Sequence, residues 1–329
     1  MNPWRPRRFL TPALLLATVA TASRPCPARE PVLFPVAQDG KSGYINADGK
    51  LVIKPQFEGA RQFSEGLAPV QVDGRWSFID ARGKQVVKPK FLSAFCHAEG
   101  LALVGVDTGW GYVDRKGAWG IPPRFEAAGG FSEGLAPVRL RGECGYIDKR
   151  GQLVIQPQFQ TAGNFRQSRA AVSMDGRFGY INPRGIFVVR PRYQAAGEYS
   201  EDLARVQVGE RCGYIDLRGG TAIEPQYEAA GDFAEGLAPV QIDGKCGYID
   251  KTGEFVVPMK FDGAWSFAEG RAVVLAEGRY GYIDKRGSYA VEPKYHGAGP
   301  FHHERAAVRI EEKWGYINKS GRWIWKPSK

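Results

Sequence analysis

Residues 247–253 read Gly-Tyr-Ile-Asp-Lys-Thr-Gly, and close variants of this stretch recur along the chain at a fixed spacing of 34 residues. The nine copies begin at Gly43, Ser77, Gly111, Gly145, Gly179, Gly213, Gly247, Gly281 and Gly315. A fixed period of this length, without insertion or deletion, indicates stacked units rather than separate globular domains. The 329-residue chain is therefore predicted to contain one repeat array.

The composition of each unit excludes helical repeats, although some helix-pair repeats share the 34-residue period. Eight of the nine units carry proline twelve positions after the start, and every unit contains several glycines. In a helix interior these residues cost about 3 and 1 kcal/mol respectively. Pairs such as Val52-Ile53 favour strands. The 42 glycines and 22 prolines are thus interpreted as turn chemistry rather than disorder.

Each unit is predicted to contain three short strands, as in residues 237–242, 246–249 and 255–261. Asp243-Gly244 between the first two is a tight-hairpin signal, because glycine accepts the positive φ that such turns require. The second and third strands are joined by Asp-x-x-Gly, where the Asp or Asn side chain can bond its own backbone. A connector such as residues 125–134 is expected to form a turn.

Several columns of equivalent residues are predicted to form the core. Three are invariant across eight units, namely Ala60 through Ala298, Ala68 through Ala306, and Val70 through Val308. Two more are aromatic, the first running from Tyr44 to Tyr316 with Phe78 in the second unit. The other comprises Phe57, Phe91, Phe125, Phe159, Tyr193, Tyr227, Phe261 and Tyr295.

The ends of the array bear on whether it closes. Residues 33–40 match a first strand and the chain stops just after a third strand, so no unit is split between the termini. Nine blades would also exceed the usual four to eight of a β-propeller. We therefore expect an all-β fold of nine three-stranded units in an open, superhelical or solenoid-like array over residues 31–329. A closed β-propeller is the alternative.

The first 22 residues have the pattern of a secretory signal peptide. Arg5, Arg7 and Arg8 precede an apolar stretch from Phe9 to Ala20, and Ala20-Thr21-Ala22 fits a cleavage site. Residues 23–30 are interpreted as a short linker. Loss of the three arginines lowers the formal charge of +10 to +7. We expect an exported protein, periplasmic or secreted, without a membrane-spanning segment in the mature chain.

The repeat also resembles a known family. Its signature is aromatic-Gly-Tyr-Ile-Asp/Asn-x-x-Gly, then Val-Ile-x-Pro-x-Phe/Tyr, then Phe-Ser-Glu-Gly-Leu-Ala-x-Val, which is similar to the bacterial WG repeat. The resemblance is clearest at residues 75–91 and 314–327. It implies an interaction scaffold and brings no catalytic residues and no cofactor. The aromatic position that opens this signature, which we call the tryptophan slot, holds tryptophan only at Trp76, Trp110 and Trp314. Elsewhere it holds Ser42, Cys144, Phe178, Cys212, Cys246 and Tyr280.

The residues that could carry catalytic or metal-binding chemistry are interpreted mainly as structural. Three cysteines occupy the aromatic slot and are read as small buried residues, with a Cys212–Cys246 disulfide left open. The cluster of His296, His302 and His303 is read as a polar surface loop rather than a metal site. The glutamates at 65, 99, 133, 201, 235 and 269 are repeated, whereas a catalytic acid should be singular. We therefore expect no enzyme activity.

The strongest functional signal is a stripe of basic residues at the two central positions of the Asp-x-x-Gly turns. These predicted binding residues are Arg82, Arg115, Lys116, Lys149, Arg150, Arg184, Arg218, Lys251, Lys285, Arg286 and Lys319. Stacking would align them into a ridge that holds an anionic envelope polymer, a lipid surface or an acidic protein. The competing interpretation is that the charged turn tips are simply exposed to solvent and prevent aggregation through the strand edges. Nucleic acid is not expected, because no aromatic residues interleave with the basic ones.

The predicted function is thus a non-enzymatic, exported scaffold that binds another macromolecule. The alternative is a glycan-binding module that uses exposed Trp76, Trp110 and Trp314 as sugar platforms. Burial of these side chains would exclude it.

Overall fold

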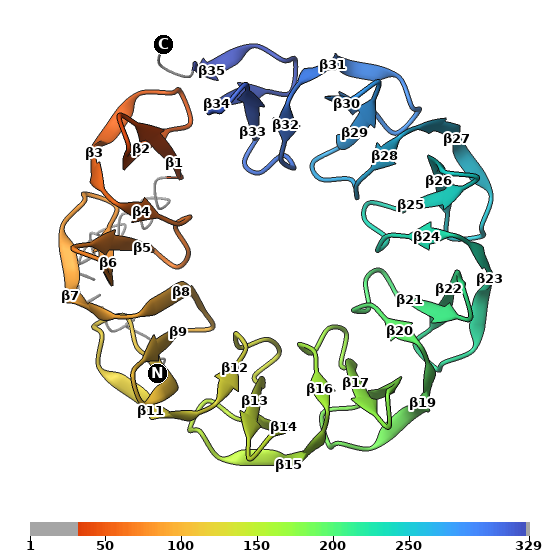
Figure 1. The fold of residues 1–329 in the computed structure, drawn as a ribbon, viewed down its shortest axis with the longest axis horizontal. Coiled ribbons are helices and arrows are strands. Elements are labelled where there is room, and N and C mark those ends of the chain that lie inside the picture. The colour runs from red at the N-terminus through yellow and green to blue at the C-terminus, as the bar shows by residue number, and fades with distance from the viewer. Residues whose placement is uncertain (1–31, 327–329) are drawn as a thin grey trace, which may run out of the picture. The chain divides into compact units, whose positions relative to one another are not determined.

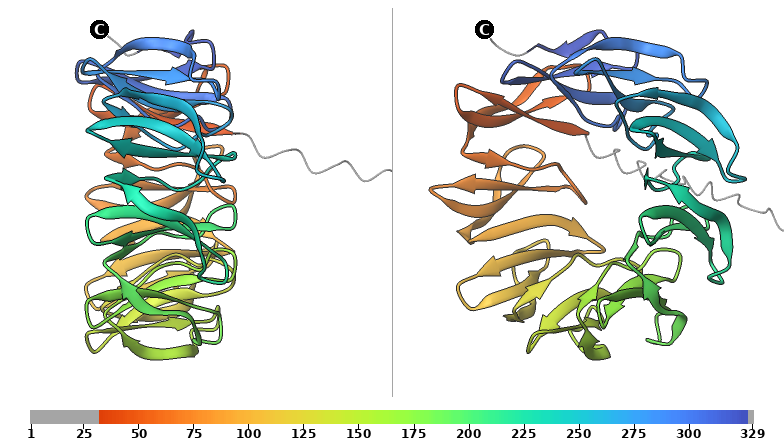
Figure 2. Two further views of the ribbon diagram at one scale, coloured as in Figure 1. Left: turned by 90° about the vertical axis from the view of Figure 1, so that its right-hand side faces the viewer. Right: turned by 45° about the vertical axis from the view of Figure 1, so that its right-hand side comes forward.

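Nine antiparallel sheets surround a common axis in the computed structural model, which describes residues 32–326 (Figure 1). Seen from the side, the ring of sheets is a shallow disc (Figure 2). We refer to the sheets as blades 1 to 9 in chain order. Blade 1 has three strands and each of the others has four. The predicted signal peptide and linker lie outside the described residues.

The strands of blades 1 to 4 are β1 (Leu33–Gln38), β2 (Lys41–Asn46), β3 (Leu51–Phe57), β4 (Gly59–Ala60), β5 (Leu67–Val72), β6 (Arg75–Asp80), β7 (Gln85–Phe91), β8 (Ser93–Ala98), β9 (Leu101–Val106), β10 (Gly109–Val113), β11 (Trp119–Phe125), β12 (Ala127–Ala128), β13 (Ala136–Leu140), β14 (Glu143–Ile147) and β15 (Leu153–Phe159). Those of blades 5 and 6 are β16 (Thr161–Ala162), β17 (Ala170–Met174), β18 (Arg177–Ile181), β19 (Phe187–Tyr193), β20 (Ala195–Ala196), β21 (Leu203–Val208), β22 (Arg211–Asp216) and β23 (Thr221–Tyr227). Those of blades 7 to 9 are β24 (Ala229–Ala230), β25 (Leu237–Ile242), β26 (Lys245–Asp250), β27 (Phe255–Phe261), β28 (Gly263–Ala264), β29 (Ala272–Ala276), β30 (Arg279–Ile283), β31 (Tyr289–Tyr295), β32 (Gly297–Ala298), β33 (Arg305–Ile310), β34 (Lys313–Asn318) and β35 (Trp323–Trp325).

The three long strands of each unit form as predicted, and the connector adds a strand that was not predicted. Gly59 and Ala60 pair with Gln71 and Val70, so the connector that follows β3 begins blade 2. In seven of the eight four-stranded blades this strand has two residues; β8 is longer. The prediction of three-stranded units is therefore wrong by one strand in eight of the nine blades.

Local turn chemistry explains the hairpins. Asp243 and Gly244 have φ of 49° and 71°, as a type I′ turn requires. In the next turn the Asp250 carboxylate accepts hydrogen bonds from the backbone N–H groups of Thr252 and Glu254, and Gly253 has φ of 90°. Both predicted turn mechanisms are confirmed.

Neighbouring blades are joined by a repeated aromatic contact. The Tyr146 hydroxyl of blade 4 donates a 2.7 Å hydrogen bond to the Gly163 carbonyl of blade 5, and its ring centroid lies 4.9 Å from that of Phe165. Both side chains are fully buried, and burial raises the pKa of Tyr146. Equivalent hydroxyl bonds start from Tyr44, Tyr112, Tyr180, Tyr214, Tyr248 and Tyr282. The predicted aromatic column thus holds each blade to the next, with Phe78 of blade 2 making the ring contact without the hydroxyl bond.

Replacing Tyr146 by phenylalanine is expected to lower the free energy of unfolding by about 0.5–1.5 kcal/mol, because the Gly163 carbonyl loses its buried donor. Urea unfolding of the variant measures the change. The control is Tyr289→Phe, whose ring is 38% exposed. A loss no greater than that of the control would contradict the assigned contact.

The array is closed, which corrects the prediction of an open, solenoid-like arrangement. The ring of Phe34 in blade 1 lies 5.4 Å from that of Tyr316 in blade 9, and the Tyr316 hydroxyl bonds the Pro35 carbonyl at 2.9 Å. Arg305 Nε of blade 9 donates to the Ala47 carbonyl of blade 1 at 2.7 Å. Blade 1 therefore packs directly on blade 9.

The junction between blades 9 and 1 reproduces an internal one. Arg169 of blade 5 makes the same bond to Leu217 of blade 6, at 3.2 Å, that Arg305 makes to Ala47. The absence of a unit split between the termini led to the prediction of an open array. Side-chain packing closes the ring without such a shared blade, so that reasoning does not hold.

Candidate functional site

The predicted basic residues lie together on one face of the ring, which we call the turn face. The Asp-x-x-Gly turns stand at the same end of the strands as the turns that open each first long strand, such as Ser64–Leu67. Lys149 of blade 4 shows this directly, because its ammonium lies 2.9 Å from Glu99 in the opening turn of blade 3. The Asp-Gly hairpins stand at the other end of the same strands.

Most of the cations at the first central position of the Asp-x-x-Gly turn form ion pairs. Lys149, Lys251, Lys285 and Lys319 form ion pairs at 2.9–3.3 Å with Glu99, Glu201, Glu235 and Glu269, each in the preceding blade. Both partners are partly exposed, so each pair stabilises the ring by only about 0.2–1 kcal/mol. These lysines therefore offer little uncompensated charge to a partner.

The glutamate column also organises the turns. Glu99 accepts the backbone N–H of Gly134 at 3.1 Å. Burial acts to raise the pKa of the Glu99 carboxyl, but Lys149 and this N–H together hold the pKa below its usual value. Similar bonds run from Gly100 to Glu65, Gly236 to Glu201 and Gly270 to Glu235. These contacts give the repeated glutamates a structural role.

The cations at the second central position of the turn have a different environment. These six cations are exposed and, within residues 32–326, form no ion pair; they are Arg82, Lys116, Arg150, Arg184, Arg218 and Arg286. The D-x-x-G turns join the two outer strands of each blade, whereas the glutamates lie on loops nearer the centre (Figure 1). The turn face therefore carries glutamates on its inner loops, and on its outer turns a ring of cations, most of which have the Asp of their own turn beside them. We call the six residues the outer cations.

A second column of equivalent residues contains no acid, and several of its cations have a structural role; it comprises Gln56, Lys90, Arg124, Gln158, Arg192, Gln226, Lys260 and Lys294. Lys260 lies 5.1 Å from the ring of Phe261 and donates to the Gly287 carbonyl of the next blade at 3.0 Å. Lys90 and Arg192 make the same two contacts. An acidic side chain could make neither contact, which explains why this column contains no acid.

The tryptophan slot lies at the blade-to-blade contacts. Trp76 and Trp110 are half-buried, and the Arg61 guanidinium lies 4.9 Å from the Trp76 ring. Trp314 is 49% exposed. The glycan-binding alternative stays a hypothesis, with Trp314 as its best exposed ring.

The cysteines of the described residues are free thiols. Cys212 is buried, and Cys212 and Cys246 are not bonded to each other. Burial raises the pKa of Cys96, Cys144 and Cys246, which keeps these thiols protonated at neutral pH. Among residues 32–326, no three His, Cys, Asp or Glu side chains are placed to hold a metal ion.

One buried histidine departs from the repeat. His97 is 2% exposed and takes the place of the connector phenylalanine, with its ring 4.9 Å from Phe78. Neither ring nitrogen forms a well-aligned hydrogen bond within the described chain. Burial lowers the pKa of His97, and the Asp114 backbone and Glu65 oppose this less strongly. The residue is a buried core histidine that is neutral at neutral pH.

The fold and its repeated surface define a β-propeller of nine blades, whose faces carry the same chemistry from blade to blade. The chain belongs to the WG-repeat family: the family model described as "WG containing repeat" matches residues 43–76, 76–107, 110–144, 145–178, 178–212, 213–246, 247–280, 280–314 and 314–327. The resemblance noted in the sequence is confirmed. No curated protein matches the chain.

One solved structure supports the closed fold. A crystal structure described as the eukaryotic initiation factor superposes with a TM-score of 0.65 at 10% identity, covering 90% of this chain and 95% of that one. The extracellular domain of a putative one-component system from B. thetaiotaomicron gives a TM-score of 0.42 at 11% identity, covering 90% and 52%. At such identities the likeness concerns the fold alone. Within the described residues, no helix has the length and apolar character to cross a membrane.

Proposed function

We propose that this WG-repeat propeller is a non-enzymatic, exported scaffold that binds an anionic macromolecular surface through its outer cations. The observation that carries the proposal is the exposure of six cations on one face without ion-pair partners in the described chain. A repeat ring multiplies weak contacts, so an extended anionic polymer can meet several cations at once. Export is supported by the signal-like pattern of residues 1–22.

Attraction of this kind depends on salt, because exposed charges are screened within about 8 Å at physiological ionic strength. We therefore expect the protein to be retained on an immobilised uronic-acid polysaccharide such as alginate, and released by rising salt. Vesicles containing phosphatidylglycerol, run in parallel, distinguish a lipid surface from a polysaccharide.

The decisive variant reverses Arg82, Arg150 and Arg184 to glutamate, and we expect it to bind several-fold more weakly. Its matched control reverses Arg75, Arg177 and Arg279, which are also exposed but stand at the start of the equivalent strands and so lie on the opposite face. Both variants change the net charge equally. Equal weakening in the two variants would contradict a site on the turn face, as would retention that does not respond to salt.

A further inference from the structure

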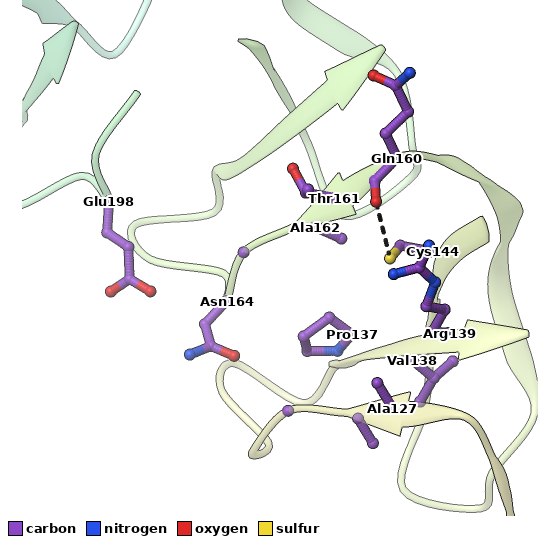
Figure 3. A pocket seen from close by; sticks show the side chains of 13 residues that line it. Ala127, Pro137, Val138, Arg139, Cys144, Gln160, Thr161, Ala162, Asn164 and Glu198 are labelled. Carbon is purple, nitrogen blue, oxygen red and sulfur yellow. Dashed lines mark hydrogen bonds between the residues drawn. The ribbon is translucent and has the colours of Figure 1, made fainter. Parts of the chain in front are cut away.

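A cavity of about 410 Å³ lies between blades 4 and 5 (Figure 3). Ala127, Arg139 and Cys144 contribute its blade 4 wall, and Thr161 and Ala162 lie across from them on β16. Glu198 of blade 6 stands at its edge. Its volume is within the range of small-molecule sites.

The position of this cavity follows from the repeat. Residues 127, 139 and 144 are cross-strand neighbours, and so are Gly59, Gln71 and Trp76 in blade 2. A Cβ atom built on Gly59 would lie 3.5 Å from the far edge of the Trp76 indole. The indole therefore covers this row of cross-strand neighbours. The same relation holds between Gly297 and Trp314, at 3.4 Å. In blade 4, cysteine replaces the indole and the space beside it stays open.

A second cysteine blade supports this origin. Cys246 of blade 7 lines an equivalent cavity with Ala229, Gln241 and Ala264, although its volume is only about 150 Å³. Loss of the slot aromatic accounts for a cavity at the same row in these two blades, whereas in blade 6 the slot residue Cys212 is buried in the core. The two cavities differ in size, so ligand binding beside Cys144 can be compared with ligand binding beside Cys246 in the same protein.

We propose that the blade 4 cavity binds a planar aromatic molecule of about the size of indole, seated where this chain places its own indoles in blades 2, 3 and 9. Its apolar wall includes Ala128, Pro137 and Ala162. The Arg139 guanidinium, held by a 3.1 Å bond from Nε to the Gly142 carbonyl, is placed to stack on a ring as Arg61 does on Trp76. This site is separate from the outer cations and does not depend on the proposed function.

Protection of the Cys144 thiol from N-ethylmaleimide tests the proposal, with indole as the probe and the modified peptides measured by mass spectrometry. Occupancy slows the reaction by the factor one plus ligand concentration over Kd, so indole at ten times Kd should slow Cys144 by about tenfold. Cys96 lies outside the cavity and should react at an unchanged rate. Cys246, beside the smaller cavity, should be slowed less than Cys144.

Two variants separate binding from folding effects. Cys144→Trp supplies the missing indole and should abolish indole binding measured by calorimetry. Ala127→Leu fills the same row while leaving the thiol in place, so it should remove the protection of Cys144 even if the tryptophan variant does not fold. Equal slowing of Cys96 and Cys144, no slowing at all, or indole protection that survives Ala127→Leu would each overturn the proposal.

Discussion

Replacing Phe34 by alanine is expected to lower the free energy of unfolding by about 3–5 kcal/mol, the usual cost of removing a buried phenylalanine. The result would be unusual for a repeat protein, because the substitution restores the residue found in every other blade. The equivalent positions are Ala68, Ala102, Ala136, Ala170, Ala204, Ala238, Ala272 and Ala306.

The reason for this cost lies in the junction between blades 9 and 1. Elsewhere each tyrosine packs on a connector aromatic ring of the next blade, as Tyr282 does on Phe301 at 4.9 Å. Blade 1 contains no fourth strand in the described residues, and Phe34, 3% exposed, packs on Tyr316 instead. Phe34 therefore fills the place of the connector ring at the closing contact.

Urea unfolding measures the loss, and amide hydrogen exchange locates it. We expect protection to fall first in blades 1 and 9, because loss of the closing contact frees both ends of the array. Val52→Ala is the control, since Val52 belongs to blade 1 but is 47% exposed. Unchanged or increased stability of Phe34→Ala would show that the closing contact does not hold the ring.

Replacing His97 by phenylalanine is expected to raise the free energy of unfolding by about 1–3 kcal/mol at neutral pH, because two buried ring nitrogens without well-formed bonds are removed. The gain should increase in acid. Burial lowers the pKa of His97 in the folded chain, so the unfolded chain binds a proton more readily than the folded chain once pH falls below the unfolded pKa of about 6.5, and the wild-type protein loses stability there.

The pH dependence provides the sharper test of the histidine. The wild-type protein should lose up to about 1.4 kcal/mol more per pH unit than His97→Phe below pH 6.5. Glu65, Asp114 and Arg115 also surround this histidine and are present in both proteins, so the difference isolates His97. The reciprocal control is Phe131→His, which should introduce the same acid sensitivity in blade 4. Parallel stability curves for wild type and His97→Phe would refute the assignment.

Much of the blade could be predicted because its determinants are local. Asp243-Gly244 and the Asp250 turn are encoded within a few residues, and the structure forms both as expected. The tyrosine column and the alanine column from Ala68 to Ala306 indicated the core correctly, whereas most members of the column from Ala60 to Ala298 are only half-buried. The short strand Gly59–Ala60 escaped prediction because two residues carry no periodicity.

Closure could not be deduced from the repeat itself, since every unit looks alike and the angle between units leaves no mark on a single sequence. One signal was present: Phe34 interrupts the alanine column where blade 1 meets blade 9. An exception within a strict repeat indicates a contact that only that unit makes.

The candidate site was predicted in part. The sequence placed the basic residues at turn tips, and the structure gathers those tips on one face. The sequence could not show that Lys149 and its equivalents form ion pairs with glutamates fifty residues away, because that pairing depends on how far one blade overlaps the next. The cavity beside Cys144 likewise depends on packing between blades.

The distance between the first and last blades tests the closed ring most directly. Spin labels attached through unnatural amino acids at Lys41 and Lys313 occupy equivalent exposed positions in blades 1 and 9. The reference pair is Lys245 and Arg279, equivalent positions in the adjacent blades 7 and 8. A closed propeller predicts the same narrow distance distribution, measured by pulsed electron resonance, for both pairs. A much longer or broad distribution for Lys41 and Lys313 alone would contradict closure.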